Sequence, residues 1–259
     1  MLWRVANSQL HLLGSAHFLP REAEFLPHEA QILHEADVVA FEANIAEARM
    51  LRQGFYGGAR SLRDDVDASL YEQTRARWTE LGLAMDDLDG TRPWNAALRM
   101  VTGAILPSHG YEHRYGVDSV ALKQAKAAKK TLFFLEPSDV GLSAFASGPL
   151  HEQVMMLAQA VRHQEEALED VQLSADAWSY RDLNRIAPLY AKCMHQAPRT
   201  YTALLDNRNK LWTPKLLRLA RGGKKTLAIV GMLHLHGPKS LLSLLEGAGH
   251  RCEADLGNQ

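Results

Sequence analysis

The segment that decides the fold is "TLAIVGMLHLHGP", residues 226–238, near the end of the chain. An apolar run there reaches a glycine, and His234 follows three positions later. The same order of residues occurs in "QLHLLGSAHFLP", residues 9–20, where a glycine precedes His17. Short apolar runs bounded by glycine and proline predict strands. Each Gly-x-x-His is therefore expected directly after a strand.

Each of these segments is expected to begin a β-loop-α-β unit. In the first unit, Pro27 opens a helix, because proline at the first helical position loses no hydrogen bond, and the strand "DVVAFE" ends in Glu42. In the second unit, Pro238 is expected to open the helix "PKSLLSLLEGAG", followed by a short strand at "HRCEA". A further strand, "TLFFLE", ends in Glu136. The sequence predicts an α/β fold, with a central mixed sheet built from two related β-loop-α-β halves and flanked by helices.

The length allows one large domain or two small ones, and the sequence shows no linker and no clear domain boundary. The chain has 259 residues, of which 46% are hydrophobic and 23% charged, enough to bury a sizeable core. The stretches at about 45–105 and 150–221 have a mainly helical pattern and are expected to be insertions into a single domain, 1–259. A formal net charge of −1 gives no reason to expect a nucleic-acid-binding protein, which carries a basic face.

Membrane and disulfide signals are weak. No apolar run approaches the roughly 18 residues of a membrane span. The first residues lack the layout of a signal peptide, so the sequence as written predicts a cytoplasmic protein, or an exported one if a leader has been removed. Cys193 and Cys252 are too few for a disulfide framework or a zinc ribbon. The sequence leaves the oligomeric state undecided, and a homo-oligomer is one possibility.

Several catalytic motifs are absent. No HE pair is followed by a second histidine at the spacing of the helical zinc-protease motif. In "GLSAF", Phe145 replaces the second glycine of a nucleophile elbow, so Ser143 is not favoured as a nucleophile. Cys193 and His195 stand two apart on a predicted helix and do not face each other.

The strand ends share a different chemistry. Four side chains lie just past the end of an apolar strand: His17, Glu42, Glu136 and His234. Ligands of α/β sheets bind beyond the carboxyl ends of the strands, and Gly14 and Gly231 allow the chain to turn sharply there. Two imidazoles with one or two carboxylates suit a divalent metal, which activates water and polarises a carbonyl. The competing interpretation is that each histidine is a hydrogen-bonded turn residue and each glutamate a solvated strand end.

A resemblance supports the first interpretation. Five segments occur in a characteristic order: "LLGSAHFLP", "LPHEAQILHEADVVAFEAN", "GYEHRYGVDSVALKQAKAAKKTLFFLEP", "LLDNRNKLW" and "LAIVGMLHLHGPKSLLSLLEGAGHRCE". In this the sequence resembles the TraB/GumN family, which includes the Tiki metalloproteases and is distantly related to erythromycin esterase-like and ChaN-like proteins. The resemblance implies a metal-dependent hydrolase, a peptidase, that uses manganese, zinc or cobalt to cleave a peptide or a small amide or ester.

The resemblance also implies roles for particular residues. His17 and His234 correspond to metal ligands, and Glu42 and Glu136 to ligands or the general base. Further family positions are matched by three residues: Asp118, Arg208 and Asn209.

Two of the remaining side chains have open roles. Arg208 is expected either to stabilise a developing oxyanion or to form a structural ion pair with Asp118 or Asp206. The additional His236 is expected to support the metal ligands from outside or to donate a proton.

Two other functions stay open at this point. A non-catalytic protein would hold a metal or a haem-like cofactor with the same histidines. An esterase of the erythromycin type would use His17 and Glu42 to activate water without a metal. In the metal-dependent case, replacing His17 or His234 is expected to abolish turnover and leave the fold intact, because both lie at strand ends outside the core.

Overall fold

The computed structural model describes residues 1–44, 53–255 and 257, and a six-stranded mixed sheet lies within that part of the chain. The strand order is β4-β3-β5-β2-β1-β6. Strands β4, β3, β5 and β2 run parallel, and β1 pairs antiparallel with both β2 and β6. The predicted α/β class and mixed sheet are confirmed. The strands are β1 (Leu2–Val5), β2 (Leu10–Ser15), β3 (Val38–Phe41), β4 (Thr131–Phe134), β5 (Thr226–Gly231) and β6 (Cys252–Ala254).

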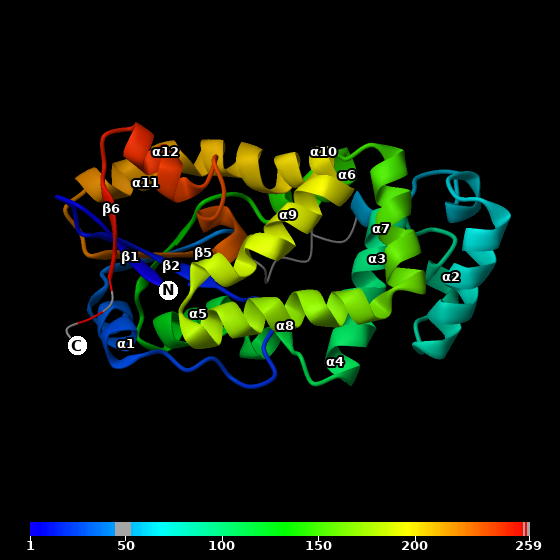
Figure 1. Ribbon diagram of the computed structural model, residues 1–259, viewed down its shortest axis with the longest axis horizontal. Helices are drawn as coiled ribbons and strands as arrows, with labels where there is room; N and C mark the ends of the chain where they lie inside the picture. The colour runs from blue at the N-terminus through cyan, green and yellow to red at the C-terminus, as the bar shows by residue number, and fades with distance from the viewer. Residues whose placement is uncertain (45–52, 256, 258–259) are drawn as a thin grey trace.

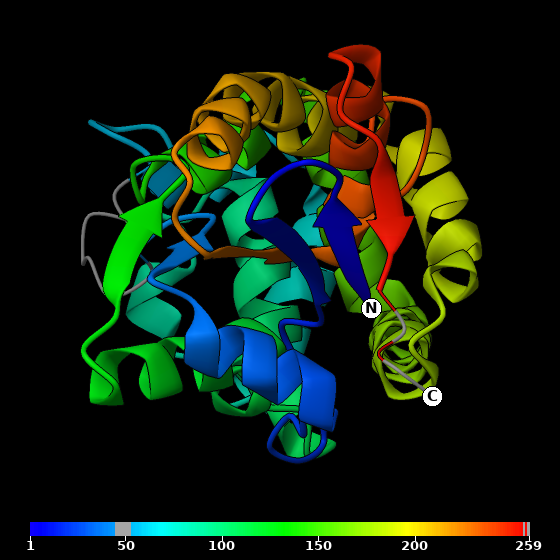
Figure 2. The ribbon, with the colours of Figure 1, turned by 90° about the vertical axis from the view of Figure 1, so that its left-hand side faces the viewer.

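Helices cover both faces of this sheet (Figures 1 and 2). Successive strand residues point to opposite faces, so β2, β3 and β5 contribute to two separate apolar clusters. One cluster contains α1 (Pro27–Glu35) and α5 (Val117–Ala127), and the other contains α11 (Arg208–Arg221) and α12 (Leu241–Gly247). Burial on both faces explains why "TLAIVG" is a continuous apolar run without polar alternation.

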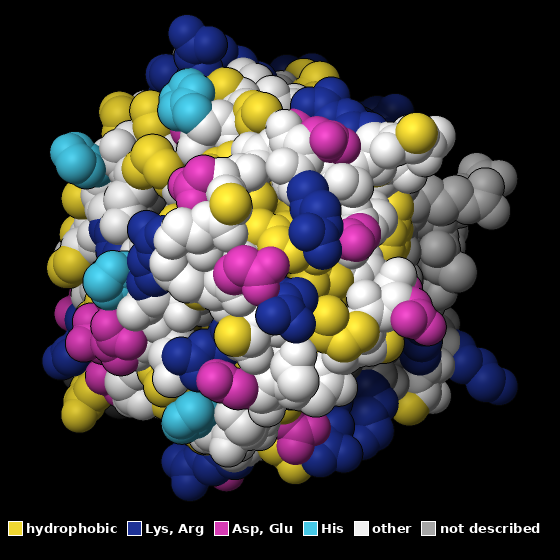
Figure 3. Space-filling view, turned by 90° about the vertical axis from the view of Figure 1, so that its right-hand side faces the viewer, with side chains coloured by type: hydrophobic (Ala, Val, Ile, Leu, Met, Phe, Trp, Pro, Cys, Tyr) yellow, Lys and Arg dark blue, Asp and Glu magenta, His cyan; other side chains and the backbone are white. Residues whose placement is uncertain are grey.

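A helical lobe extends from one end of the sheet (Figure 1). It contains α2 (Ala68–Glu80), α3 (Pro93–Met100) and α7 (Leu150–Arg162), which enclose their own apolar core around Trp78 and Leu157. The long helix α8 (Gln164–Tyr180) joins this core to one of the sheet clusters. The outer face of the lobe carries acidic and basic side chains intermixed with apolar ones (Figure 3).

Most of the other helical segments lie in the predicted stretches at about 45–105 and 150–221, but those at 106–108, 113–115, 140–147 and 232–235 lie outside them. Residues 45–52 are outside the described part of the chain. Within residues 1–44, 53–255 and 257, no helix combines the length and the hydropathy that crossing a bilayer requires. The remaining α-helices are α4 (Leu106–Ser108), α6 (Val140–Ser147), α9 (Ala187–Gln196) and α10 (Pro198–Tyr201). The π-helical segments are η4 (Val101–Ile105) and η7 (Thr202–Asn207). The 3₁₀ segments are η2 (Leu62–Asp64), η3 (Met85–Asp87), η5 (His113–Tyr115), η6 (Leu183–Ile186) and η8 (Met232–Leu235).

The start of the last helix differs from the prediction. Pro27 begins α1 as expected, but Pro238 does not begin α12. The helix begins at Leu241, because the side chain of Ser240 accepts a hydrogen bond from the N–H of Ser243 and caps it. The residues between β5 and this cap therefore form a loop that contains η8 and His234.

Candidate functional site

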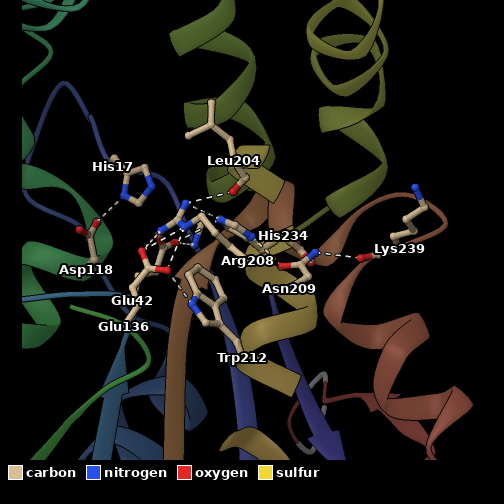
Figure 4. A network of polar contacts seen from close by, with 11 residues as sticks. His17, Glu42, Asp118, Glu136, Leu204, Arg208, Asn209, Trp212, His234 and Lys239 are labelled. Atoms are coloured by element: carbon tan, nitrogen blue, oxygen red, sulfur yellow. Dashed lines mark hydrogen bonds and ion pairs between the residues drawn. The ribbon is translucent and has the colours of Figure 1, made fainter. Parts of the chain in front are cut away.

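The four predicted side chains meet at one edge of the sheet (Figure 4). His17 follows β2, Glu42 follows β3, Glu136 follows β4, and His234 follows β5. Parallel strands bring their carboxyl ends to the same edge, so neighbouring strands deliver these residues together. The N–H of Glu136 donates to the carbonyl of Glu42 at 2.9 Å, which extends the pairing of β3 and β4 into the site.

Arg208 lies at the centre of this edge. It is the first residue of α11 and comes directly after the π-helical segment η7 (Thr202–Asn207). Its Nη2 donates to Glu42 Oε2 and to Glu136 Oε1, both at 2.7 Å, and its Nε lies 3.0 Å from Glu136 Oε1. Its Nη1 donates to the carbonyl of Leu204 at 3.1 Å. Only 8% of this residue is exposed, so the guanidinium is a buried cation shared by two carboxylates.

The charges of this group depend on one another. Burial alone would lower the pKa of Arg208, but the carboxylates of Glu42 and Glu136 raise it. Burial alone would raise the pKa of Glu42, but the positive charge of Arg208, followed by His234 and His17, holds it well below its usual range. Glu42 and Arg208 are therefore ionised together across the neutral range.

Glu136 fixes the orientation of this arginine. Its Oε2 accepts a hydrogen bond from Trp212 Nε1 at 2.9 Å, while Oε1 accepts from Arg208. The guanidinium carbon lies 4.5 Å from the centre of the Trp212 ring. Gly141 borders the pair, and a Cβ there would stand in ordinary contact range, 3.4 Å from Nη2 of Arg208. Both oxygens of Glu136 have donors, and these hydrogen bonds hold Arg208 and Trp212 in place.

The predicted structural ion pair of Arg208 with Asp118 or Asp206 is wrong, because Arg208 pairs with Glu42 and Glu136. Asp118 pairs with His17 instead, at 3.2 Å. Asp206 pairs with Lys239, at 2.8 Å. The reason is that the guanidinium extends to the sheet edge, where the two strand-end glutamates lie, and its ion pair is formed there.

His17 is the more exposed of the two histidines, with 47% of its side chain accessible. Its Nδ1 faces Asp118 Oδ1, in the first turn of α5. A Cβ on Gly231 would stand 3.0 Å from His17 Nε2 and 3.2 Å from Glu42 Oε1, so glycine keeps this space open. Desolvation lowers the pKa of His17, but Asp118 and then Glu42 outweigh it and raise the pKa to about 9.

His234 is buried, with 3% of its surface exposed. Its ring packs on Trp212, with 4.5 Å between the ring centres. Asn209 Nδ2 donates to the carbonyls of His234 and Lys239, so its Oδ1 faces His234 Nδ1 at 2.7 Å. Burial lowers the pKa of His234 to about 3, so this ring is neutral at ordinary pH. The expectation that His234 lies outside the core is wrong, because η8 turns the ring inward.

Both histidines turn the same nitrogen toward Glu42. An Nδ1 that faces an oxygen acceptor carries the hydrogen, and the neutral ring then has its lone pair on Nε2. Asn209 assigns this tautomer to His234, whereas His17, whose pKa is raised to about 9, carries hydrogen on both nitrogens at neutral pH and reaches this tautomer only after losing a proton. The Nε2 of His234 lies 3.8 Å from Glu42 Oε1 and 3.3 Å from Nη1 of Arg208. The chain ends thus bring two imidazoles to one carboxylate.

The donor types at this edge are those of a divalent metal site. Imidazole nitrogen and carboxylate oxygen suit zinc, manganese and cobalt, and an Nδ1 bound to an oxygen is the usual arrangement for a metal-binding histidine. Among residues 1–44, 53–255 and 257, no three His, Cys, Asp or Glu side chains already stand together as a complete coordination group. Arg208 contacts both Glu42 and His234. The donor types suit a divalent metal, but Arg208 contacts two of the donors, so a cation would have to displace its hydrogen bonds.

The other predicted residues lie around this centre. A Cβ on Gly14 would stand 3.2 Å from Leu235 and 3.5 Å from the Cβ of Met232, so this glycine lets η8 approach β2. The ring of His236 packs edge-on against Tyr190, with 5.2 Å between centres. Burial lowers the pKa of His236.

The sequence reasoning missed Trp212 as a member of the site. It follows Arg208 by one helical turn, and residues four apart share a helix face. The segment "RNKLW" therefore carried a signal for its position beside Arg208. The contact with Glu136 depended on the tertiary fold.

A comparison with protein-family models gives one match. The model described as the TraB/PrgY/gumN family matches residues 1–254. This range contains all six strands and every residue of the site described above. No curated protein and no solved structure matches the chain.

Proposed function

This chain belongs to the TraB/PrgY/gumN family, and on that premise we propose that it is a metal-dependent hydrolase that cleaves peptide or other amide bonds. His17, His234 and Glu42 would hold a divalent ion of manganese, zinc or cobalt. The observation that carries the proposal is that Nε2 of His234 lies 3.8 Å from Glu42 Oε1, and that Nε2 of His17 and the same oxygen both border the space beside Gly231. Such an ion, when bound, activates water and polarises a substrate carbonyl.

Asp118 and Asn209 orient the two rings in this proposal. Each binds an Nδ1, at 3.2 Å and 2.7 Å respectively, and so prevents the ring from turning over. Partners of this kind commonly change metal affinity or activity by about 10–100-fold when they are removed. Glu42 stays ionised because Arg208 lowers its pKa, so it remains available as a ligand.

Arg208 stabilises the oxygen that becomes negative. A guanidinium has five N–H groups, and here they face Glu42, Glu136, the carbonyl of Leu204 and Nε2 of His234. Nη1 of Arg208 donates toward Nε2 of His234, and a metal ion bound by His234 would need the lone pair of the same nitrogen. The N–H that faces His234 is therefore the one that Arg208 can turn to a substrate oxygen. Glu42 and Glu136, which share Nη2 of Arg208, are the carboxylates that would accept the water proton.

The test combines metal analysis with substrate cleavage. Purified protein is assayed for bound metal, and peptide cleavage is measured in chelator and after manganese, zinc or cobalt is restored. We expect cleavage to stop in chelator and return with metal. His17→Ala and His234→Ala should abolish it, while His11→Ala serves as the matched control because His11 lies inside β2 and faces Asp255. Cleavage at full rate in metal-free protein would defeat the proposal.

One observation favours a second candidate, a metal-independent esterase. The half-exposed His17 ring, oriented by Asp118, is the arrangement of a general base that activates water. Because its pKa is about 9, the neutral form of His17 increases roughly fiftyfold between pH 7 and pH 9. Ester hydrolysis that persists in chelator and rises over this range would favour the esterase. Loss of all hydrolysis in chelator would exclude it.

A further inference from the structure

The carboxylate of Asp118 lies between two imidazoles. Its Oδ1 stands 3.2 Å from Nδ1 of His17, and its Oδ2 stands 3.8 Å from Nε2 of His113. Asp118 is mostly buried, with 16% of its side chain exposed. His113 lies on the outer side of it, with 41% of its side chain exposed. The proposed function gives His113 no role.

Two contacts fix the ring of His113. Its Nδ1 lies 3.1 Å from Oγ of Ser119, and its face-to-edge contact with Phe18 places the ring centres 5.5 Å apart. A carboxylate only accepts hydrogen bonds, so the Nε2 that faces Asp118 carries the hydrogen in the neutral ring. Nδ1 then accepts the hydrogen of the Ser119 hydroxyl.

Backbone hydrogen bonds join the segment that carries His113 to the loop that carries His17. The N–H of Glu112 donates to the carbonyl of Leu19 at 3.0 Å, and the N–H of Val117 donates to the carbonyl of Ala16 at 3.0 Å. Gly116 is required between them, because a Cβ there would stand 2.2 Å from the carbonyl oxygen of His17. His113 is therefore held at a fixed place relative to the loop that carries His17.

We propose that His113 is a positioning residue that sets the Asp118 carboxylate for His17, an inference that rests on the proposed role of His17 as a metal ligand. Nε2 of His113 lies 3.8 Å from Oδ2, within ion-pair range but longer than a hydrogen bond, so it attracts this oxygen electrostatically. This attraction favours the orientation of the carboxylate in which Oδ1 is directed at Nδ1 of His17. His113 touches neither metal nor substrate and acts through Asp118.

Matched variants separate this role from simple packing. His113→Phe keeps an aromatic ring against Phe18 but removes both nitrogens. His113→Gln places an amide N–H at about the position of Nε2. In the metal-free protein, proton NMR measures how fast the Nδ1–H of His17 exchanges with water. We expect His113→Phe and Asp118→Asn to speed this exchange about tenfold, and His113→Gln to stay within about twofold of the unchanged protein.

Binding of Mn²⁺ alone, measured by calorimetry, gives the second readout. His113→Phe should weaken binding about tenfold, and His113→Gln should restore most of it. Added to Asp118→Asn, His113→Phe should cause no further loss, because both act on one contact. Unchanged exchange of the His17 N–H in His113→Phe, or an equal loss of Mn²⁺ affinity in the Asp118→Asn background, would overturn the inference. If the unchanged protein binds no Mn²⁺, the proposed function fails, and the exchange rates still decide the role of His113.

Discussion

The two Gly-x-x-His segments follow equivalent strands and present the same ring nitrogen, yet their histidines carry opposite charge properties. His17 is 47% exposed, faces the carboxylate of Asp118, and has its pKa raised to about 9. His234 is 3% exposed, faces the amide of Asn209, and has its pKa lowered to about 3. The motif therefore fixes where the imidazole lies. The partner on another element decides whether the ring holds a proton.

The difference has a structural cause. The loop after β2 crosses the start of α5, whose first turn supplies Asp118 and leaves one side of the ring accessible. The loop after β5 forms η8, and the ring of His234 in it packs on Trp212 of α11. The candidate site thus contains one cationic ring and one neutral ring at neutral pH. Only His17 has to lose a proton before it can donate a lone pair.

The largest expected effect comes from Arg208, which pairs with Glu42 and Glu136 and contacts His234. Arg208→Met leaves Glu42 and Glu136 buried without their cation, and we expect the free energy of unfolding to fall by about 3–5 kcal/mol. Urea denaturation measures it. The control is Arg4→Met, which breaks an exposed pair with Glu253 and should cost no more than about 1 kcal/mol. Equal losses in the two variants would contradict the central place given to Arg208.

The next effect separates the two histidines by burial. His234→Ala removes a ring packed on Trp212 and should lower the free energy of unfolding by about 2–4 kcal/mol. His17→Ala removes a half-exposed ring and should lower it by less than about 1 kcal/mol. Both variants should lose metal-dependent cleavage. Equal stabilities, measured by urea denaturation, would show that the burial difference has no energetic meaning.

The positions of the site residues were predictable because they depend on local pattern. Apolar runs ending in Gly14 or Gly231 identify strands, and parallel strands must bring the residues after their carboxyl ends to one edge of the sheet. The partner of Arg208 was not predictable, since it depends on how the π-helical turn of η7 directs the side chain toward Glu136. The burial of His234 was hidden for a similar reason. A histidine in a loop is expected to be exposed, and the sequence alone does not show that α11 packs over this one.

Exchanging the two ring partners should sharpen the comparison. Asp118→Asn removes the negative charge beside His17, so its pKa should fall from about 9 by about 1–3 units. Asn209→Asp places a carboxylate at Nδ1 of His234, so its pKa should rise above about 3. Ring-proton NMR titration of the metal-free variants measures both values. If each substitution leaves its own ring unchanged, the partner does not set the charge.

The smallest effect is a dependence of stability on pH that belongs to His17 alone. The pKa of His17 is about 9 in the folded protein and 6.5 when unperturbed, so the charged ring stabilises the folded state. This contribution is fully present below pH 6.5 and is lost as the pH rises through about 9. Its size should stay below about 1 kcal/mol, because the ring is half-exposed and solvent screens the pair with Asp118.

Urea denaturation of the metal-free protein from pH 6 to pH 10 should show the decline, and His17→Gln should remove it. His234→Gln should leave the decline in place, because that ring is already neutral throughout this range. A decline of the same size in His17→Gln would assign the effect to another group and remove the contrast between the rings.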